Sequence, residues 1–262
     1  MQPSKTLKEL YSDHTGLVSD KWELYLTEYN GLFDPYRKLE INMLEIGVQN
    51  GGSLEIWAKY FSTARRIVGC DINPLCRNIS FASDAIRFVP GDINDIETLA
   101  AIQEHASKFD IIIDDGSHVS SDIIHTFSML FPLLEENGIY VIEDLHCSYW
   151  SRFEGGLTAE KSAVSFLKKL IDVVNFEHWG MPGTRCNILE QFDAQALSDE
   201  NLAMIHSVSF SNSMCIIKKK TKENNILGRR WVVGEIENVA PSKQANGTYS
   251  KPEPQQIHPF VD

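Results

Sequence analysis

The chain has 262 residues and carries 24 lysine and arginine side chains against 36 aspartate and glutamate side chains, a formal net charge of −12. So acidic a chain does not offer the positive field that binds a nucleic-acid backbone or an anionic membrane surface, and we expect neither partner. With 43% hydrophobic and 23% charged residues, its composition is that of an ordinary globular protein. A chain of this length buries enough surface to fold without disulfides or a structural metal.

The cysteines and the start of the chain bear on the cellular compartment. The five cysteines are an odd number and include no C-x-x-C pair, so we expect reduced thiols. No apolar run is long enough to span a bilayer, and residues 1–10 lack the apolar core of a signal peptide. These features predict a cytoplasmic protein.

Short apolar runs alternate with helical patterns along the middle of the chain. This alternation predicts a doubly wound α/β fold with a mostly parallel sheet. Two β-rich runs, 204–210 and 214–218, are separated by three residues and predict a hairpin that adds an antiparallel strand, which makes a Rossmann-like sheet of seven strands. The five earlier strands are predicted over residues 41–47, 66–72, 85–89, 109–115 and 138–144, and the helices over 53–61, 95–107, 119–134 and 159–174.

A change in composition after residue 220 divides the chain. Residues 221–262 are polar and rich in turn-forming residues, with one apolar island at 231–233, which predicts a tail that is at most partly ordered. We therefore expect an N-terminal helical cap over residues 1–40, a catalytic domain over 41–220 and a polar C-terminal tail over 221–262. Within the cap, Ser19 and Asp20 offer a helix N-cap ahead of aromatic residues.

A glycine-rich turn follows the first predicted strand. Its sequence, Glu45-x-Gly47-x-x-x-Gly51-Gly52, lets the backbone approach a ligand closely but lacks the G-x-G-x-x-G spacing of dinucleotide folds. Asp71 ends the second strand, where a carboxylate can accept both hydroxyls of a ribose. Because ligands bind beyond the carboxyl ends of parallel strands, loop and acid together favour a nucleoside site over a plain turn followed by a solvated acid.

Acidic residues also end the fourth and fifth predicted strands. Asp115 lies within Asp114-Asp115-Gly116-Ser117-His118, and Glu143-Asp144 follows the fifth strand. Bare carboxylates at neighbouring strand ends repel one another, and a hard divalent cation such as Mg²⁺ relieves that repulsion. A free imidazole has a pKa of about 6.5, so histidine is the residue type best suited to act as a general base near neutral pH, and His118 is the candidate here. The first motif alone is equally compatible with a helix cap and a surface histidine, whereas the second pair favours a metal site.

Three rings follow the fifth strand: His146, Tyr149 and Trp150. They are suited to line an acceptor pocket by stacking on a sugar or another apolar face, although a packed aromatic loop accounts for them equally well. We expect the acceptor to be selected by the irregular regions, which are residues 11–37, 145–160 and 176–190.

Together these motifs resemble those of class I S-adenosylmethionine-dependent methyltransferases. They are most similar to the metal-dependent sugar O-methyltransferases of macrolide and rhamnosyl natural products, whose core is shared by cephalosporin-hydroxylase-like proteins. The resemblance covers residues 15–156 well and the rest more loosely, and residues 1–40 are too few for the large N-terminal domain of the macrolide enzymes. The residues that carry it are Glu45 to Gly52, Asp71, 109–118, 138–144 and Ser148-Tyr149-Trp150.

The resemblance implies the residues of the cofactor site. Asp71 would bind the ribose of S-adenosylmethionine and Asp92 would lie near its adenine. The residues 19–21 would help to cover the cofactor. The complete set of expected cofactor contacts is Glu45, Gly47, Gly51, Asp71, Asp92 and Asp114.

The resemblance also implies the catalytic residues. Asp115, Glu143 and Asp144 would hold Mg²⁺ or another hard divalent cation, and His118 would be the general base that deprotonates the acceptor. His146 stands where the family carries a different polar residue, so we expect a different acceptor pocket.

The resulting hypothesis is a metal-dependent O-methyltransferase that acts on a hydroxyl of a sugar or a glycosylated natural product. A catechol-type acceptor, in which both oxygens of a diol bind the ion, stays open. So does a non-catalytic protein that binds S-adenosylmethionine on the same fold. A third alternative, an NAD-dependent oxidoreductase, is disfavoured by the missing glycine spacing. The expected partner is a small hydroxyl-bearing molecule, and a homo-oligomer is left open.

Overall fold

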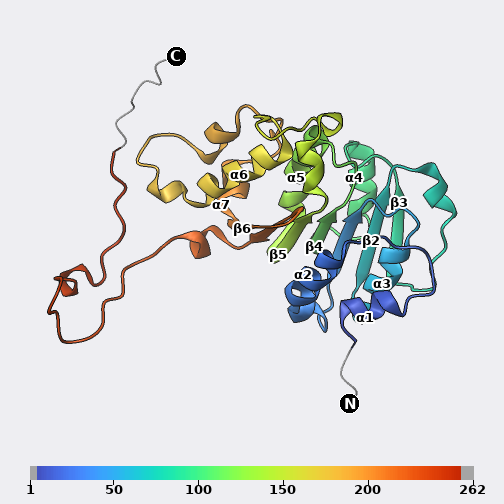
Figure 1. Ribbon diagram of the computed structural model, residues 1–262, viewed down its shortest axis with the longest axis horizontal. Coiled ribbons are helices and arrows are strands. Elements are labelled where there is room, and N and C mark those ends of the chain that lie inside the picture. Colours follow the sequence, from blue (N-terminus) through green and yellow to red (C-terminus); the bar gives the residue numbers. More distant parts are fainter. Residues whose placement is uncertain (1–4, 255–262) are drawn as a thin grey trace.

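The computed structural model describes residues 5–254, and its centre is one sheet of seven strands (Figure 1). The strand order is β3-β2-β1-β4-β5-β7-β6, and β7 runs antiparallel to both of its neighbours while β1 to β5 are parallel. This order confirms the expected Rossmann-like fold with a C-terminal hairpin. The strands are β1 (Asn42–Ile46), β2 (Arg66–Asp71), β3 (Ile86–Pro90), β4 (Phe109–Asp114), β5 (Leu134–Ile142), β6 (Ile205–Ser211) and β7 (Met214–Lys219).

Helices cover both faces of the sheet, since side chains of successive strand residues point to opposite faces. In β1, Met43 packs among the side chains of α1, α2 and α3, whereas Leu44 packs among those of α4, α5, α6 and α7. Both residues are fully buried. The helices are α1 (Leu7–Ser12), α2 (Glu23–Phe33), α3 (Gly52–Tyr60), α4 (Ile96–Gln103), α5 (Ser120–Leu130), α6 (Ala163–Val174) and α7 (Asp199–Ala203).

The boundary between α5 and β5 differs from the sequence prediction. The helix expected over 119–134 ends at Leu130, and a short 3-10 turn, Phe131–Leu133, follows. Pro132 accounts for the early end because it lacks the N–H that a continuing helix needs. Strand β5 then starts at Leu134, where it pairs with Phe109 before an irregularity in the ladder. The polar residues that follow Leu134 concealed this extension of the strand.

The start of α2 also differs. Ser19 and Asp20 do not cap this helix, which follows Trp22 and has no side-chain hydrogen bond at its N-cap. Residues 17–22 instead run across the carboxyl edge of the sheet, where the backbone carbonyl of Val18 accepts a hydrogen bond from the Gly52 N–H. The segment is therefore part of the ligand-binding edge rather than a helix cap.

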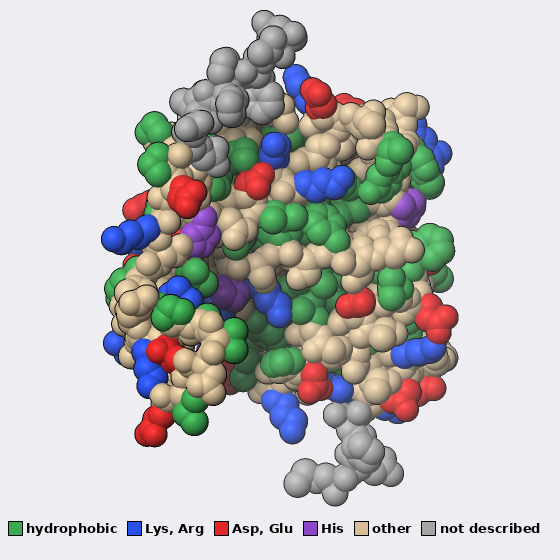
Figure 2. All heavy atoms as spheres, turned by 60° about the vertical axis from the view of Figure 1, so that its left-hand side comes forward, with side chains coloured by type: hydrophobic (Ala, Val, Ile, Leu, Met, Phe, Trp, Pro, Cys, Tyr) green, Lys and Arg blue, Asp and Glu red, His purple; other side chains and the backbone are tan. Residues whose placement is uncertain are grey.

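After β7 the chain is irregular and leaves the body of the molecule (Figure 1). Figure 2 shows the side of the molecule that lies on the left in Figure 1; hydrophobic side chains and charges of both signs are interspersed there. The strongly exposed apolar side chains of the tail include Trp231, Val233 and Val239. Residues 1–4 of the expected cap and 255–262 of the expected tail lie outside the described residues. Within residues 5–254, no helix has the length and apolar character needed to cross a membrane.

Candidate active site

The carboxyl edge of the parallel strands brings the first glycine loop against the end of β4. Gly47 follows β1 with a φ of +83°, and a Cβ at this position would lie 1.9 Å from the carbonyl oxygen of Asp115. Only glycine combines this left-handed backbone with so close an approach. Glycine at this position therefore lets the loop pack directly against the backbone at the end of β4.

Asp71, at the end of β2, holds this loop in place. Its Oδ2 accepts the backbone N–H groups of Val48 at 2.9 Å and of Gln49 at 2.8 Å. Its Oδ1 accepts the N–H of Asn73 at 2.8 Å. A carboxylate offers about four acceptor positions, so one position on Oδ1 is left for a ribose hydroxyl.

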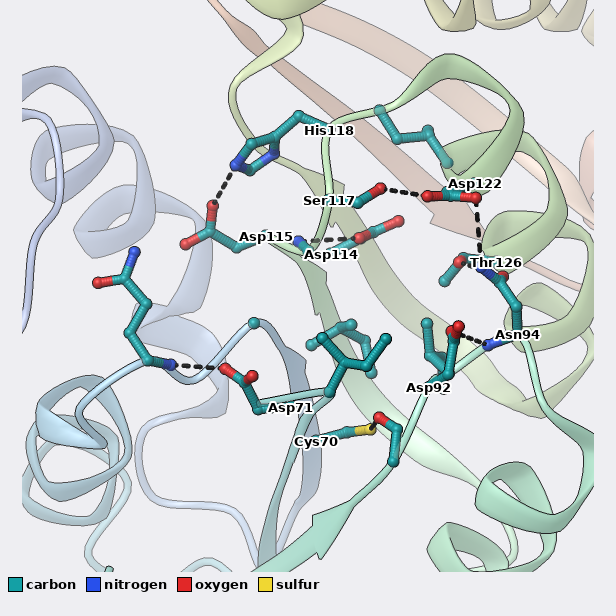
Figure 3. A pocket seen from close by; sticks show the side chains of 18 residues that line it. Cys70, Asp71, Asp92, Asn94, Asp114, Asp115, Ser117, His118, Asp122 and Thr126 are labelled. Carbon is teal, nitrogen blue, oxygen red and sulfur yellow. Dashed lines mark hydrogen bonds and ion pairs between the residues drawn. The ribbon is translucent and has the colours of Figure 1, made fainter. Parts of the chain in front are cut away.

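A cleft opens beside Asp71 and extends along the carboxyl ends of β1 to β4 (Figure 3). Asp92 lines it, and its Oδ1 accepts the N–H of Asn94 at 3.0 Å. Asp114 lines the inner end of the cleft; one of its oxygens accepts the N–H of Gly116 at 3.3 Å, and Oδ2 has no hydrogen-bond partner within the described chain. Gly47 and Asp71 line the same cleft, so four of the predicted cofactor residues meet here.

Two further predicted cofactor residues lie outside this cleft. Glu45 is fully buried beneath the loop, where its Oε2 accepts the hydroxyl of Ser53 at 2.6 Å. Gly51, with a φ of +86°, is the N-cap of α3 and shapes the loop from outside the cleft. Neither residue lines the cleft in this structure. Their contact with a cofactor stays a prediction.

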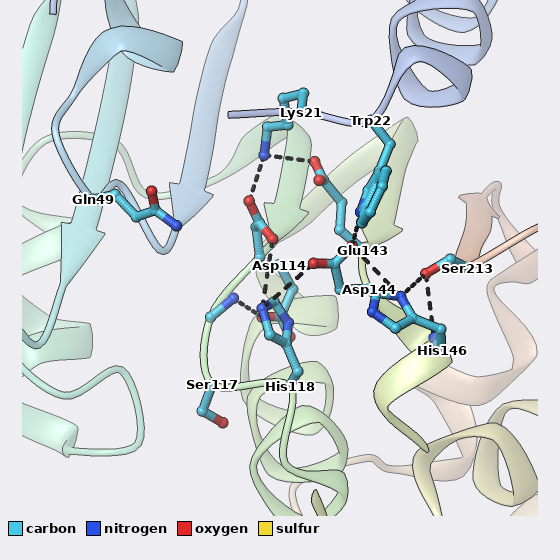
Figure 4. Close-up of polar contacts among 12 residues, drawn as sticks. Lys21, Trp22, Gln49, Asp114, Ser117, His118, Glu143, Asp144, His146 and Ser213 are labelled. Atoms are coloured by element: carbon cyan, nitrogen blue, oxygen red, sulfur yellow. Dashed lines mark hydrogen bonds and ion pairs between the residues drawn. The ribbon is translucent and has the colours of Figure 1, made fainter. Parts of the chain in front are cut away.

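Asp115, His118 and Asp144 come together at the edge of the cleft. Figure 3 shows His118 facing Asp115, and Figure 4 shows it facing Asp144. The Nε2 atom of His118 lies 3.9 Å from Oδ1 of Asp115 and 3.8 Å from Oδ2 of Asp144. One ligand atom from each residue lies within 4.8 Å of the other two. The two carboxylates are oxygen donors that fit a hard divalent cation, and the imidazole beside them leaves a nitrogen available for proton transfer.

Lys21 is buried among three carboxylates of this edge. Its side chain is 2% exposed, and its Nζ lies 2.5 Å from Asp115, 2.8 Å from Glu143 and 3.5 Å from Glu45. Glu143, predicted as a metal ligand, points its Oε1 to Lys21 and also accepts the hydroxyl of Tyr29 at 2.5 Å. The structure therefore places Glu143 against Lys21, on the buried side of the cluster.

Burial shifts the pKa values of these acids upward. It raises the pKa of Asp114 to about 7 and that of Glu143 to about 8, and it also raises the pKa of Asp115 despite the adjacent ammonium of Lys21. Burial by itself lowers the pKa of Lys21, but attraction to Glu143, Asp115 and Glu45 outweighs it and raises this pKa well above the ordinary value. Lys21 thus stays charged and compensates part of the acidity.

The backbone at two cluster residues is left-handed. His118 has a φ of +59° and Asp144 a φ of +54°. Such a conformation costs a residue with a side chain of the order of 1–2 kcal/mol. The surrounding contacts hold it: the Oδ1 of Asp144 accepts the indole N–H of Trp22 at 3.1 Å and the hydroxyl of Tyr25 at 2.8 Å.

A second cavity, of about 550 Å³, lies on the other side of Asp144. His146 and Trp150 line it, whereas Tyr149 is not part of its wall. Their expected contact with an acceptor stays a prediction. Trp22 and Tyr25 of the N-terminal region form the facing wall, and Ser213 closes it from the β6–β7 turn. The imidazole of His146 lies edge-on to both indoles, with ring centres 6.2 Å from Trp22 and 5.0 Å from Trp150.

The sequence motifs did not identify the residues, far away in sequence, that contact the acids of this edge and His146. Lys21 was expected to cover the cofactor and instead balances three carboxylates. Trp22, Tyr25 and Tyr29 had no predicted role, although their spacing of three and four residues places them on one face of a helix. That spacing was the one signal that could have found them. Nothing in the sequence around Ser213 indicated that it meets His146.

Comparison with known proteins agrees with this arrangement. Residues 44–145 match the family model described as a methyltransferase domain. A rhamnosyl tetracenomycin-C 2'-O-methyltransferase of Streptomyces olivaceus is 37% identical over 164 residues, which are 59% of this chain and 42% of that protein. The mycinamicin VI 2''-O-methyltransferase of Micromonospora griseorubida is 29% identical over 235 residues, which are 86% of this chain and 55% of that protein.

Among solved structures, the mycinamicin-pathway methyltransferase MycE superposes with a TM-score of 0.69 at 28% identity. The match covers 84% of this chain and 55% of that protein, which was crystallised with Mg, S-adenosylhomocysteine and mycinamicin VI. The chain thus spans about half the length of the curated relatives that it matches.

Proposed function

We propose that this chain, which carries a methyltransferase domain over residues 44–145, methylates a hydroxyl of a sugar or glycosylated natural product with S-adenosylmethionine and a divalent cation. The observation that carries the proposal is the position of the Asp115–His118–Asp144 cluster. It lies between a polar cleft suited to a nucleoside and an aromatic cavity suited to an acceptor. The named activities of the relatives, which are sugar O-methylations, support the same acceptor class.

Cofactor binding follows from the polar cleft. Asp71 offers an acceptor position to the ribose, and Asp92 lies farther along the cleft, where we place the adenine. Gly47 and Asp115 line the same cleft, and we place the sulfonium end of the cofactor beside them. The cleft thus directs the methyl group toward the cluster.

His118 performs the proton transfer in this proposal. When bound, the cation held by Asp115 and Asp144, with Glu143 as a further candidate ligand, would lower the pKa of the acceptor hydroxyl, and the cofactor supplies the electrophilic methyl group. The Nε2 atom of His118 takes the hydroxyl proton while the oxygen forms its bond to the methyl carbon. The bond from that carbon to sulfur breaks, and S-adenosylhomocysteine leaves as a neutral thioether.

The test is metal-dependent formation of S-adenosylhomocysteine on glycosides. We expect turnover of a rhamnoside with Mg²⁺, loss of it with EDTA, and recovery when Mg²⁺ is restored. Asp115→Ala should lower the rate at least about a thousandfold, since metal activation is worth several kcal/mol, and should leave S-adenosylmethionine binding in calorimetry near the wild-type value. Equal rates with and without EDTA would refute the metal assignment. Turnover of catechols in preference to glycosides would instead identify the chain as a phenol O-methyltransferase.

A further inference from the structure

His146 is held by the turn of the β6–β7 hairpin. The Oγ atom of Ser213 lies 2.6 Å from Nδ1 of the imidazole and accepts the backbone N–H of His146 at 3.2 Å. Ser213 has a φ of +67°, so this turn adopts a left-handed conformation that places the hydroxyl against the ring. Two contacts from one side chain therefore fix the ring at the wall of the acceptor cavity.

These contacts decide which nitrogen carries the proton. The hydroxyl hydrogen of Ser213 has no other acceptor within the described residues, so it is donated to Nδ1, which then accepts. Asp144 does not compete for this site, since its Oδ1 lies 3.9 Å from Nδ1, beyond hydrogen-bond distance, and accepts Trp22 and Tyr25. The neutral imidazole consequently carries its proton on Nε2, an atom with no hydrogen bond within the described chain.

The walls beside this donor are aromatic. The Trp22 side chain is 60% exposed and that of Trp150 44%, so both indoles offer apolar surface to a bound molecule. His118 and His146 lie on either side of Asp144 (Figure 4), at 3.8 Å and 3.9 Å from its two oxygens. A molecule with an apolar face and more than one hydroxyl can contact the indoles and both imidazoles, and a sugar ring has this chemistry.

We propose that His146 is a specificity-determining residue whose Nε2–H donates a hydrogen bond to the acceptor oxygen next to the methylated hydroxyl. Ser213 is its positioning residue, which acts by fixing the tautomer. The inference rests on the proposed function and extends it, because it specifies an acceptor with two adjacent oxygens and assigns the second oxygen to a residue outside the cluster.

The first test is kinetic, with p-nitrophenyl rhamnoside and its monodeoxy analogues as acceptors. His146→Phe keeps the aromatic packing without the donor, and His146→Gln keeps a donor near the position of Nε2. We expect His146→Phe to raise the KM for the rhamnoside about tenfold, the equivalent of one hydrogen bond, with a smaller change in kcat and unchanged S-adenosylmethionine binding. His146→Gln should recover most of this loss.

The analogues identify the bonded oxygen. In the wild-type enzyme, the KM for one monodeoxy rhamnoside should be about tenfold higher than the KM for the parent rhamnoside. In His146→Phe, the two KM values should be equal. Unchanged KM in His146→Phe, or the same loss in His146→Gln and His146→Phe, would overturn the inference while leaving the proposed function standing. Wild-type failure on every glycoside would overturn both.

The second test measures the tautomer directly and needs no turnover. Long-range proton–nitrogen NMR correlations of the imidazole should show the proton on Nε2 of His146 in wild type. In Ser213→Ala the signal should move toward the other tautomer or a mixture. A proton on Nδ1 in the wild-type protein would contradict the proposal.

Discussion

The two sides of the site are held in different ways. On the cofactor side, Asp71 and Asp92 are fixed by backbone N–H groups between 2 and 23 residues away in sequence. On the acceptor side, Asp144 is fixed by side chains of Trp22 and Tyr25, 122 and 119 residues away, and His146 by Ser213, 67 residues away. Loops at the strand ends thus build the polar cleft, whereas tertiary packing builds the aromatic cavity. Substitutions should therefore affect the two sides in separable ways.

The largest effect should come from His118→Ala. General-base catalysis contributes about 10²–10⁴-fold, so kcat should fall by that factor while S-adenosylmethionine affinity stays near wild type. Rapid-quench measurement of methyl transfer, with calorimetry for cofactor binding, checks this. His125, in the middle of α5 and outside the cluster, is the matched control as His125→Ala. A wild-type rate for His118→Ala would remove this residue as the base.

Lys21→Met tests whether the ammonium of Lys21 stabilises the three carboxylates around it. It leaves three buried carboxylates without their ammonium, and breaking such a pair typically costs about 3–5 kcal/mol. Denaturant unfolding should show this loss, and Mg²⁺ should raise the midpoint more in the variant than in wild type, since the ion replaces the missing charge. Lys59→Met, on exposed α3 surface, is the control. Equal stability of the two variants would contradict the assigned role of Lys21.

Asp71→Asn tests the cofactor side. The amide cannot accept at both former oxygens, so at least one loop N–H loses its partner, at a cost of about 1–3 kcal/mol. We expect S-adenosylmethionine to bind at least about tenfold more weakly and the KM for the acceptor to stay unchanged. Asp84→Asn, exposed in the loop before β3, should match wild type in both measurements. If Asp71→Asn raised the KM for the acceptor and left S-adenosylmethionine binding unchanged, the assignment of Asp71 to the cofactor side would be wrong.

The smallest effect expected is the pH dependence of stability without metal. Folding raises the pKa of Asp114 from 3.8 to about 7 and that of Glu143 from 4.5 to about 8. An acid that binds its proton more tightly in the folded state stabilises the fold below its unfolded pKa, and this contribution is lost as pH rises. The Tm of the apoprotein should therefore fall between pH 5 and pH 8. Mg²⁺ should counteract the fall, because its ligands must be deprotonated.

A Tm that rises steadily over this range would contradict the raised pKa values. The double variant Asp114→Asn, Glu143→Gln provides the internal control, because it removes both titrating groups and should flatten the profile.

The difference between the two sides also explains what the sequence could reveal. The strand ends at Asp71, Asp115 and Asp144 follow apolar runs, so the shared edge of the sheet and its acids were predictable from local pattern. The partner of Glu143 was not, because Lys21 reaches it through the path of residues 17–22, which no local pattern encodes. The same holds for Ser213, whose meeting with His146 depends on the position of β7 beside β5.

The left-handed backbone at His118 and Asp144 has a consequence for protein engineering. Glycine adopts this conformation without the cost borne by a side-chain-bearing residue. A redesign guided by folding stability alone would therefore favour glycine at both positions and would delete one nitrogen and one carboxylate from the cluster. Thermostabilised variants of this chain should accordingly be selected for retained turnover as well as for Tm. At these two positions, the residue that favours stability differs from the residue that the activity requires.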